Sequence, residues 1–451
     1  MAQHVHFVGI GGIGVSGVAQ LALKQGRQVS GSDLKESSIT RRLVREGVKV
    51  YLEHKPENIK GADLVVYSSA ISSSNPELVA ARQSGVPVQR RAEFLSVLMA
   101  DKKVITITGA HGKTTTSSLA AHLLMSAGLH PTLAVGGILR EDGDNAKLGD
   151  SLYFVAEADE SDGTFLCYRP MYSIITNIDQ EHMDFYKTTD NLLGYFSKFV
   201  SQTEKNGCVF YCFEDEVLKN IVQTSSVRNT SYGFSPQANY YAQDILLDKC
   251  RISFSCLKEG HVLGEVTLGL MGRHNILNAL SVVALGQELG IDFKMIQKAL
   301  ANFKGVERRF QIKYENKNFL VVDDYGHHPT EIAATLAAAK LCGRRRLVVV
   351  FQPHRFSRTH LLMDALVRSL AGADVLFVTD IYAAGEKPIE GVNSEQIIDR
   401  VQKDSKTTAS YVPKAEIIAE LKKIVQPDDL ILFLGAGDIT KISDEFSKSC
   451  G

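Results

Sequence analysis

The chain has 451 residues, with 50 Lys and Arg against 51 Asp and Glu and a formal net charge of -1. This length exceeds what one hydrophobic core usually supports, so we expect two or three domains. The balanced charge excludes a global basic field of the kind that captures nucleic acid or anionic membranes, and it favours small-molecule partners.

The segment MAQHVHFVGIGGIG leads directly into an apolar run and a glycine turn. It lacks the basic segment and the cleavage site of a signal peptide, and no apolar stretch reaches the roughly 18 residues of a membrane span. We therefore predict a cytoplasmic protein without membrane insertion and without nucleic acid as a partner.

Seven cysteines are scattered along the chain, an odd number without CxxC pairs. This pattern predicts free buried thiols rather than a disulfide framework or a metal site. The cysteines are Cys167, Cys208, Cys212, Cys250, Cys256, Cys342 and Cys450.

Short β-branched runs recur along the chain, and each is followed by a glycine-rich or polar turn and a helical pattern. This rhythm is typical of βα units around a parallel sheet, so we predict an α/β fold. The expected strands are His4–Val8, Val104–Thr108, Leu152–Ala156, Ser173–Thr176, Phe319–Val322, Leu347–Phe351, Val375–Thr379 and Leu430–Leu434. Because ligands of open α/β sheets bind beyond the carboxyl ends of the strands, the polar clusters after these runs are candidate sites.

Two charged stretches that each precede a new strand predict domain boundaries, so we expect three domains. These stretches are Ala100–Lys103 and Phe303–Arg309. We predict a Rossmann-like N-terminal domain at residues 1–99 and a P-loop ATPase-type central domain with a parallel sheet at 100–304. A second Rossmann-like domain follows at 305–451. Between Cys208 and Gly272, short alternating runs predict an antiparallel flank on the central sheet.

The first glycine turn contains Gly9, Gly11 and Gly14, directly after a strand and at the start of a helix. With Asp33 at the end of the next strand, it matches the dinucleotide-binding fingerprint. A tight turn at a helix N-terminus accepts any pyrophosphate, including that of a UDP-sugar. The turn therefore predicts phosphate binding and leaves NAD open as one of several ligands.

A second glycine-rich loop lies between strand and helix in VITITGAHGKTTTSS. In such loops, backbone N–H groups hold the phosphates, a lysine such as Lys113 reaches the β and γ oxygens, and a hydroxyl such as that of Thr114 ligates Mg²⁺. Only two residues separate Gly109 from Gly112, fewer than in the common GxxxxGK[ST] loop. The segment predicts a nucleoside triphosphate site.

Carboxylates gather after the next strand, in FVAEADESDGTF. Beside a nucleotide loop they are the expected Mg²⁺ partners, because this ion needs hard oxygen ligands, although a solvated acidic turn has the same pattern. Glu157 is closest to the strand and is our first choice. TNIDQEHMD then places His182 after the following strand.

Four later clusters, GRHNILNA, GVERRF, DDYGHHPTEI and QPHRFSRT, combine histidines, arginines and amides. Guanidinium forks suit phosphate and carboxylate recognition, although each cluster alone is also compatible with surface salt bridges. Taken in order, all these motifs resemble those of the Mur ligases, ATP-dependent amide-bond ligases of peptidoglycan precursor synthesis. The resemblance covers essentially the whole chain and includes GSD at 31–33 and YSSAI at 67–71.

Within that family the pattern is most similar to members that join L-alanine to UDP-N-acetylmuramate. Two positions depart from it: Ala110 stands where Thr or Ser is more usual, and Glu181, beside His182, stands where Asp is more usual. The carbamoylated lysine of related ligases is not expected here. The resemblance implies ATP and Mg²⁺ as cofactors, UDP-N-acetylmuramate and L-alanine as substrates, and a monomer or homodimer.

The resemblance also implies residue roles. The UDP-sugar site comprises Gly11, Gly12, Ile13, Gly14, Asp33, Ser68 and Ser69. The ATP site comprises Gly109, Ala110, His111, Gly112, Lys113, Thr114, Thr115, His274, Asn275, Asn278 and Arg308. The metal ligands are Thr114, Glu157 and His182. The amino acid meets Tyr325, His354 and Arg358, and the catalytic set is Lys113, His327, His354, Arg355 and Arg358.

An amide forms from a carboxylate and an amine at neutral pH only after the carboxylate is activated, so we expect an acyl phosphate made with ATP. Catalysis is then mostly positioning and charge neutralisation. His327 or His354 is expected to accept the amine proton. Three alternatives remain: a Mur ligase for another amino acid or peptide, an NAD-dependent oxidoreductase, and a nucleotide switch without amide product.

Overall fold

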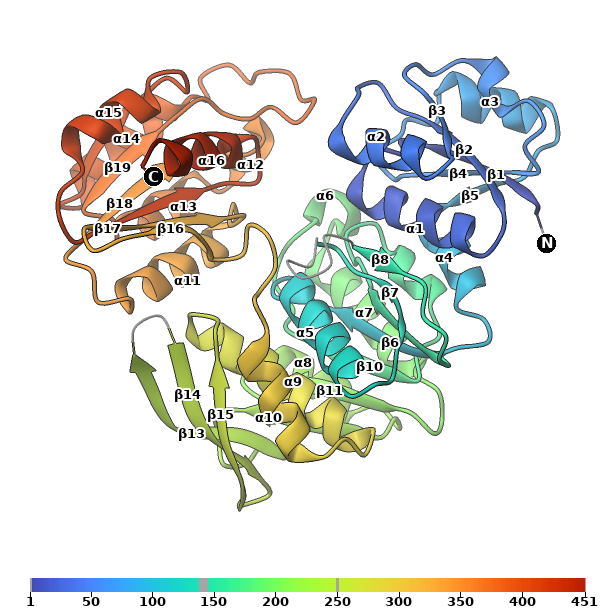
Figure 1. The fold of residues 1–451 in the computed structure, drawn as a ribbon, viewed down its shortest axis with the longest axis horizontal. Coiled ribbons are helices and arrows are strands. Elements are labelled where there is room, and N and C mark those ends of the chain that lie inside the picture. The colour runs from blue at the N-terminus through green and yellow to red at the C-terminus, as the bar shows by residue number, and fades with distance from the viewer. Residues whose placement is uncertain (1, 138–144, 249–250, 451) are drawn as a thin grey trace. The chain divides into compact units, whose positions relative to one another are not determined.

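The computed structural model describes residues 2–137, 145–248 and 251–450 (Figure 1). Over these residues the strands form three sheets, and parallel strands alternate with helices, which confirms the α/β class. Contacts divide the chain into two compact units. The first is Met1–Gln243, Ser255–Val266 and Leu277–Phe303, and the second is Asp244–Phe254, Thr267–Ile276 and Lys304–Gly451.

The N-terminal sheet has the parallel order β3-β2-β1-β4-β5. Its chain runs through β1 (His4–Val8), α1 (Ile13–Lys24), β2 (Gln28–Ser32), α2 (Ser38–Arg45), β3 (Lys49–Tyr51), η1 (Pro56–Ile59), β4 (Leu64–Tyr67), α3 (Pro76–Gln83), β5 (Val88–Arg90) and α4 (Arg91–Leu98). The strand order reverses between β1 and β4, which is where open α/β sheets bind ligands. The glycine turn, residues 9–14, begins at this point.

A buried carboxylate ties the elements of this sheet together. Glu77 on α3 is fully buried and accepts hydrogen bonds from Ser32 Oγ at 2.5 Å and Asn58 Nδ2 at 2.6 Å. Its carboxylate also lies 3.6 Å from His6 Nε2 and 3.1 Å from His54 Nδ1. Burial alone would raise the pKa of Glu77, but hydrogen bonds from His6, Ser32 and Asn58 lower it. A buried network of this kind fixes the loops that it joins.

The central sheet has the order β15-β14-β13-β12-β11-β10-β6-β9-β7-β8. Its elements are β6 (Lys103–Thr108), α5 (Lys113–Ser126), β7 (Thr132–Ala134), β8 (Ala146–Lys147), β9 (Tyr153–Glu157), η2 (Thr164–Cys167), β10 (Tyr172–Ile175), α6 (Met183–Tyr186), α7 (Thr189–Ser201), β11 (Cys208–Cys212), α8 (Glu216–Gln223), β12 (Asn229–Gly233), β13 (Tyr240–Asp248), β14 (Arg251–Lys258), β15 (His261–Leu268), α9 (Arg273–Glu288) and α10 (Phe293–Asn302).

The antiparallel flank is narrower than the sequence predicts. Between Cys208 and Gly272 we expected alternating strands throughout, but β11 and β12 continue the parallel sheet. The antiparallel flank instead consists of β13, β14 and β15. Glu259 and Gly260, which join β14 to β15, both have left-handed backbones, with φ of 49° and 84°. Two such residues give the tight turn of an antiparallel hairpin.

The C-terminal sheet has the order β16-β17-β21-β18-β19-β20, with β16 antiparallel to β17 and the other pairs parallel. Its elements are β16 (Gln311–Glu315), β17 (Phe319–Asp324), α11 (Pro329–Lys340), β18 (Arg346–Phe351), α12 (Phe356–Leu361), α13 (Met363–Leu370), β19 (Val375–Val378), α14 (Ser394–Asp404), β20 (Thr408–Tyr411), α15 (Ile417–Ile424), β21 (Asp429–Leu434) and α16 (Ile439–Ser449). Buried aliphatic residues of β17, β18 and β21 form the centre of this domain.

The expected strands all occur, with ends shifted by at most two residues. The domain bounds 1–99, 100–304 and 305–451 stay a prediction. The cysteines in the described part of the chain are free, and Cys208, Cys212 and Cys256 are buried, whereas Cys250 lies outside the described residues. Among the described residues no helix is long and apolar enough to cross a bilayer.

Candidate active site

The glycine loop, residues 109–112, joins β6 to α5 in a conformation that requires glycine at both ends. Gly109 has a φ of 122° and Gly112 a φ of 83°, values that residues with a side chain adopt only with strain. There is also no room for a side chain, since a Cβ on Gly112 would lie 2.8 Å from Asn278 Oδ1. The close approach of Asn278 places one predicted ATP-site residue directly against the loop.

The end of β10 holds the glycine loop in place. Asn177 accepts from His111 N through Oδ1 at 2.9 Å and from Ala110 N through its backbone oxygen at 3.2 Å. Thr176 Oγ1 donates to His111 O at 2.6 Å, and His111 Nε2 lies 2.9 Å from Asp179 Oδ2. Ala110 is thus fixed through its backbone, so the departure from Thr or Ser leaves the loop anchored. Thr176 and Asn177 hold the loop in place and were absent from our site prediction.

Lys113 lies at the start of α5 and is fixed by three acceptors. Its Nζ donates to Gly109 O at 2.6 Å, Ala110 O at 3.0 Å and Glu160 Oε1 at 2.9 Å. Burial alone would lower the pKa of Lys113, but the carboxylates around it, Glu160 above all, raise it. Burial raises the pKa of Glu160, against the charge of Lys113. The lysine is therefore a fixed positive charge at the mouth of the loop.

The carboxylates of Glu157 and Glu160, at the end of β9 and just after it, lie in two different environments. Glu157, our first choice for the metal, accepts from Gly136 N at 3.2 Å and Ser117 Oγ at 3.5 Å. Glu160 instead pairs with Lys113, and its Oε1 lies 3.8 Å from His182 Nε2. Glu160 was in the acidic cluster that the sequence singled out, but the sequence alone does not distinguish it from its neighbours.

The glycine turn at the start of α1 is braced by a carboxylate, as the fingerprint predicts. Asp33 Oδ2 accepts from Gly11 N at 2.8 Å, and a Cβ on Gly11 would lie 2.8 Å from the same oxygen. Gly12 precedes the first turn of α1, where Ile13 and Gly14 follow. The turn therefore presents backbone N–H groups at a helix N-terminus, an arrangement that binds phosphate.

A cavity of about 320 Å³ in the first unit joins the glycine turn to the central sheet. Among the residues that line it are the predicted UDP-sugar residues Gly12, Ile13, Gly14, Ser68 and Ser69, together with Arg91, Asn145, Glu157 and Asp159. Asn145, which precedes β8, donates from Nδ2 to Ile13 O at the start of α1 at 2.7 Å and so connects these two segments at the cavity. Arg91 and Asn145, which our site prediction missed, supply a cation and an amide beside the turn.

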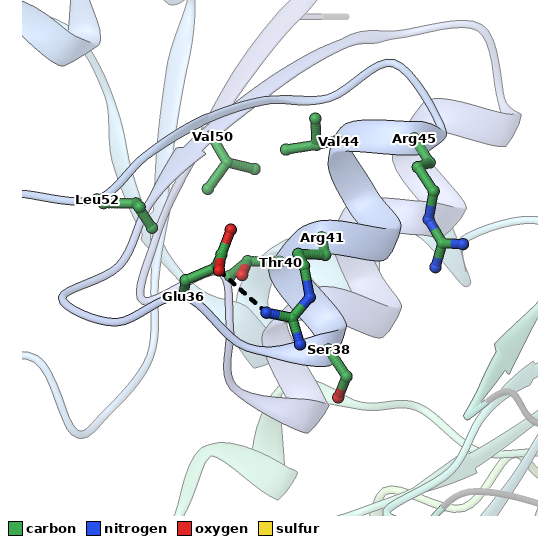
Figure 2. A pocket seen from close by; sticks show the side chains of 8 residues that line it. All are labelled: Glu36, Ser38, Thr40, Arg41, Val44, Arg45, Val50 and Leu52. Carbon is green, nitrogen blue, oxygen red and sulfur yellow. Dashed lines mark hydrogen bonds and ion pairs between the residues drawn. The ribbon is translucent and has the colours of Figure 1, made fainter.

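A second pocket lies on α2 and β3, with a volume of about 540 Å³ (Figure 2). Its apolar floor consists of Val44, Val50 and Leu52, and the ion pair of Arg41 with Glu36, at 3.0 Å, lies on its rim. Both partners of this pair are more than half exposed, so the pair adds little stability. None of the predicted site residues lines this pocket.

Two of the remaining ATP-site predictions begin α9. His274 is exposed, whereas Asn275 is buried and donates through Nδ2 to Met271 O at 2.7 Å. Thr114 and Thr115, in the first turn of α5, are also mostly buried. Arg308 lies in the C-terminal domain and donates through Nη2 to Gly435 O at 2.6 Å and Gly437 O at 3.0 Å.

A row of rings follows the strand ends of the C-terminal sheet. Tyr325 lies 5.4 Å from His327, His327 lies 5.4 Å from His354, and His354 stacks on Tyr382 at 5.7 Å, as distances between ring centroids. Arg358 Nη1 lies 3.1 Å from His354 Nδ1. The structure thus brings the predicted residues Tyr325, His327, His354 and Arg358 together and adds Tyr382, which our prediction missed.

Three predicted site residues have left-handed backbones although they are not glycines. The φ angles are 57° at His182, 58° at Arg308 and 69° at Arg355. Arg355 is exposed, and its N–H donates to Tyr382 O at 2.8 Å. Such backbones cost energy and are often found at functional sites.

Three family models together span most of the chain. The Mur ligase family catalytic domain matches residues 4–103, the Mur ligase middle domain 107–286, and the Mur ligase glutamate ligase domain 308–437. The chain belongs to the Mur ligase family.

The alignments with relatives in this family extend over almost the whole of this chain and of each relative. The UDP-N-acetylmuramate–L-alanine ligase of Syntrophobacter fumaroxidans is 47% identical over 98% of this chain and 95% of its own. That of Geotalea uraniireducens is 45% identical over 98% of this chain and 97% of its own. The crystal structure of the UDP-N-acetylmuramate–alanine ligase of Thermotoga maritima matches with a TM-score of 0.84 at 32% identity, covering 100% of this chain and 99% of the other.

Mur ligases use ATP, and the site of this Mur ligase fits its phosphates and an accompanying Mg²⁺. The glycine loop keeps its tight conformation because a Cβ at Gly109 or Gly112 would clash with Thr176, Asn177 or Asn278, and loops of this kind present backbone N–H groups to phosphate. The donor set near Lys113 is rich in carboxylate oxygens, the hard ligands that Mg²⁺ prefers. One of them, Glu160 Oε2, is buried and without a hydrogen-bond partner among the described residues.

The two histidines of this Mur ligase that we expected to accept a proton differ in environment. Burial, followed by the charges of His327, Arg358 and Arg355, lowers the pKa of His354 to about 3. A neutral imidazole with so low a pKa is a weak base, whereas His327 Nδ1 lies 3.4 Å from the carboxylate oxygen Glu331 Oε2. His354 is then suited to hydrogen bonding in its neutral form.

His354 is expected to stay neutral throughout the pH range above about 4, because its pKa lies near 3. The measurement is a proton NMR titration of the histidine ring signals in the full chain, with His354→Gln to assign the signal. A His354 signal that shifts with a midpoint between pH 6 and 7 would contradict this expectation.

Proposed function

We propose that the protein joins L-alanine to the lactyl carboxylate of UDP-N-acetylmuramate, with ATP converted to ADP and phosphate, in peptidoglycan precursor synthesis. The observation that carries this function is the 47% identity to an L-alanine ligase over 98% of the chain. The glycine turn and the glycine loop support it, because they provide two separate phosphate sites, one for a UDP-sugar and one for ATP. A dehydrogenase needs only the first, and a nucleotide switch only the second.

The reaction proceeds in two steps. A carboxylate oxygen of the lactyl group attacks the γ-phosphorus of ATP, the bond to the β-γ bridging oxygen breaks, and ADP leaves. The amine of L-alanine then attacks the acyl carbon, the phosphate departs with the electron pair of the acyl–oxygen bond, and the amine nitrogen loses a proton. Both steps depend mainly on positioning and charge neutralisation.

Different residues of the chain are proposed for different parts of this reaction. Lys113 supplies a fixed positive charge for the transferred phosphoryl group, within the backbone cradle of the glycine loop. Mg²⁺, when bound, neutralises phosphate charge, with Thr114, Glu157 and His182 as its expected ligands. His327 takes the amine proton, and Tyr325, His354 and Arg358 orient the amino acid, with Arg355 close to the reacting lactyl carboxylate. Asn275, Asn278, His274 and Arg308 are proposed around the nucleotide.

Two further statements stay predictions: that the protein is cytoplasmic, and that it is a monomer or a homodimer. The second candidate function is a Mur ligase that adds a different amino acid or peptide, and the residues of the C-terminal domain around the amino acid decide between the two.

The test is phosphate release from ATP and Mg²⁺ by the purified chain. We expect release only when UDP-N-acetylmuramate and L-alanine are both present, with mass spectrometry identifying UDP-N-acetylmuramoyl-L-alanine as the product. Release with D-glutamate in place of L-alanine would favour the second candidate. Release that needs neither substrate would favour a nucleotide switch.

A further inference from the structure

Tyr382 covers one face of the His354 ring in the C-terminal domain. The two rings lie at 12° to each other, with centroids 5.7 Å apart, and Tyr382 is 38% exposed. Two backbone hydrogen bonds of 2.8 Å fix Tyr382 on both sides of this histidine: its N–H donates to Pro353 O, and its oxygen accepts from Arg355 N. A tyrosine this exposed contributes little to the hydrophobic core, so its fixed position requires another explanation.

A glycine makes room for the Tyr382 ring. Gly437 lies in the turn between β21 and α16, where a Cβ would lie 2.7 Å from Tyr382 Cγ and 2.9 Å from its Cβ, and would clash with Gln352 Oε1. The φ of Gly437 is not positive, so the backbone conformation alone does not demand glycine here. The close approach of the tyrosine ring and of the Gln352 amide does.

A carboxylate fixes the segment of Tyr382 to the segment of His354 a second time. Glu386 accepts from Ser357 N at 3.0 Å and from Ser357 Oγ at 2.7 Å, at the start of α12. Residues 382–386 are thus attached at both ends to residues 353–357. The backbone that carries the Tyr382 ring is therefore held in place against the histidine.

The contact of His354 with Arg358 decides which ring nitrogen carries the proton. Arg358 Nη1 lies 3.1 Å from His354 Nδ1, and a guanidinium can only donate. Nδ1 is therefore the acceptor, and in the neutral imidazole the proton is on Nε2. A protonated ring would place a second donor against the guanidinium. The contact is thus favourable only while His354 is neutral and keeps this orientation, in which Nε2–H is left to donate to a ligand.

We propose that Tyr382 is a positioning residue for the amino-acid substrate: its ring holds the His354 imidazole in the plane in which Nδ1 accepts from Arg358 and Nε2–H donates to L-alanine. The inference rests on the proposed function, in which His354 and Arg358 orient the amino acid. It adds a side chain that acts through His354 and does not itself touch the reacting atoms. The ring also keeps water from one face of the imidazole, which disfavours the charged form.

The surroundings of His354 indicate what removal of the Tyr382 ring would change. Burial is the largest cause of the low pKa of His354, which lies at about 3. The charged and titratable groups that face the ring are His327, Arg355, Arg358 and Glu386. Of these only the carboxylate raises the pKa, and the others lower it. Without the Tyr382 ring one face of His354 is open to water, so the largest of these effects weakens and the pKa of His354 rises.

The first test is a proton NMR titration of His354 in the full chain, which needs no substrate. In Tyr382→Ala the midpoint should rise by at least about one pH unit, whereas Tyr382→Phe, which keeps the ring, should leave it near the native value. Both variants should fold, because Tyr382 is partly exposed. The matched control is Tyr411→Ala, since Tyr411 ends β20 of the same sheet and is 37% exposed. This control should keep the native midpoint.

The second test is steady-state kinetics with ATP, UDP-N-acetylmuramate and L-alanine. Tyr382→Ala should raise the KM for L-alanine by roughly three- to tenfold, the effect of losing one aromatic pair, and change kcat and the KM for ATP less. Tyr382→Phe should restore the KM for L-alanine. A native KM and an unchanged His354 midpoint in Tyr382→Ala would overturn the role of Tyr382 alone, and so would equal increases in the KM for ATP and for L-alanine. Inactivity of the native chain with L-alanine would overturn the proposed function and this inference with it.

Discussion

Replacing Lys113 with alanine is expected to lower the ligase kcat by roughly 10²- to 10³-fold or more, the effect of removing one fixed group that stabilises charge in a transition state. Lys113 is the charged donor held against the glycine loop by Gly109, Ala110 and Glu160. Its loss removes the positive charge from the phosphoryl group in transfer. The measurement is steady-state phosphate release with ATP, UDP-N-acetylmuramate and L-alanine.

The control for this variant is Lys102→Ala. Lys102 also donates from Nζ to a backbone oxygen, that of Ser151 at 2.7 Å, but it lies just before β6, at the opposite end of the strand from the glycine loop. Its replacement should leave kcat nearly unchanged. Thermal unfolding of both variants separates lost catalysis from lost folding. A folded Lys113→Ala chain with native kcat would exclude Lys113 from the phosphoryl transfer step.

Replacing Gly109 with alanine is expected to weaken ATP binding and to lower kcat by roughly 10²-fold or more, because a displacement of about 1 Å in groups that position a reactant is enough for a rate loss of that size. The new Cβ would clash with Thr176 Oγ1 and lie 2.7 Å from Asn177 O and 2.9 Å from Asn177 N. Backbone atoms at the end of β10 do not move aside easily. The φ of 122° adds strain, so the whole loop must shift.

Gly128→Ala provides a matched control, since Gly128 follows the other end of α5. Its φ of 73° is also left-handed, but a Cβ there meets no atom of the described residues within 4 Å. This variant should lose about 1 kcal/mol of stability from backbone strain and keep its affinity for ATP. Calorimetric titration with a non-hydrolysable ATP analogue compares the two chains. Equal affinities would show that the shape of the glycine loop does not control ATP binding.

The placement of the polar clusters at strand ends was predictable from the sequence. Apolar runs followed by glycine or polar residues have a local cause, since strands of a parallel sheet are buried and their carboxyl ends open onto a ligand site. Lys113 follows directly from this rule, because the loop after β6 and the start of α5 are both local features. The order of the motifs along the chain was also sufficient to indicate the family.

The partner of Lys113 was not predictable from the sequence. Glu157 and Glu160 are three residues apart in one acidic segment, and nothing in their spacing says which of them faces the loop. The tertiary structure decides it through local turns: Ser161 N donates to Asp159 Oδ1 at 3.0 Å, and Thr164 N donates to Asp162 Oδ1 at 3.0 Å. These turns bring Glu160 under Lys113, whereas Glu157 stays at the strand end beside Ser117.

Contacts between distant segments account for the other differences. Tyr382 stacks on His354 because β18 and β19 are neighbours in the sheet, a pairing that no short motif encodes. We predicted that the antiparallel flank begins at Cys208, but it begins later in the chain, because the short strands β11 and β12 have parallel partners. The sequence by itself determined the βα rhythm, the two glycine-rich phosphate loops and the family, since these depend on local patterns. Only the tertiary structure decided which side chains meet, because that depends on strand order and on turns that fold distant residues together.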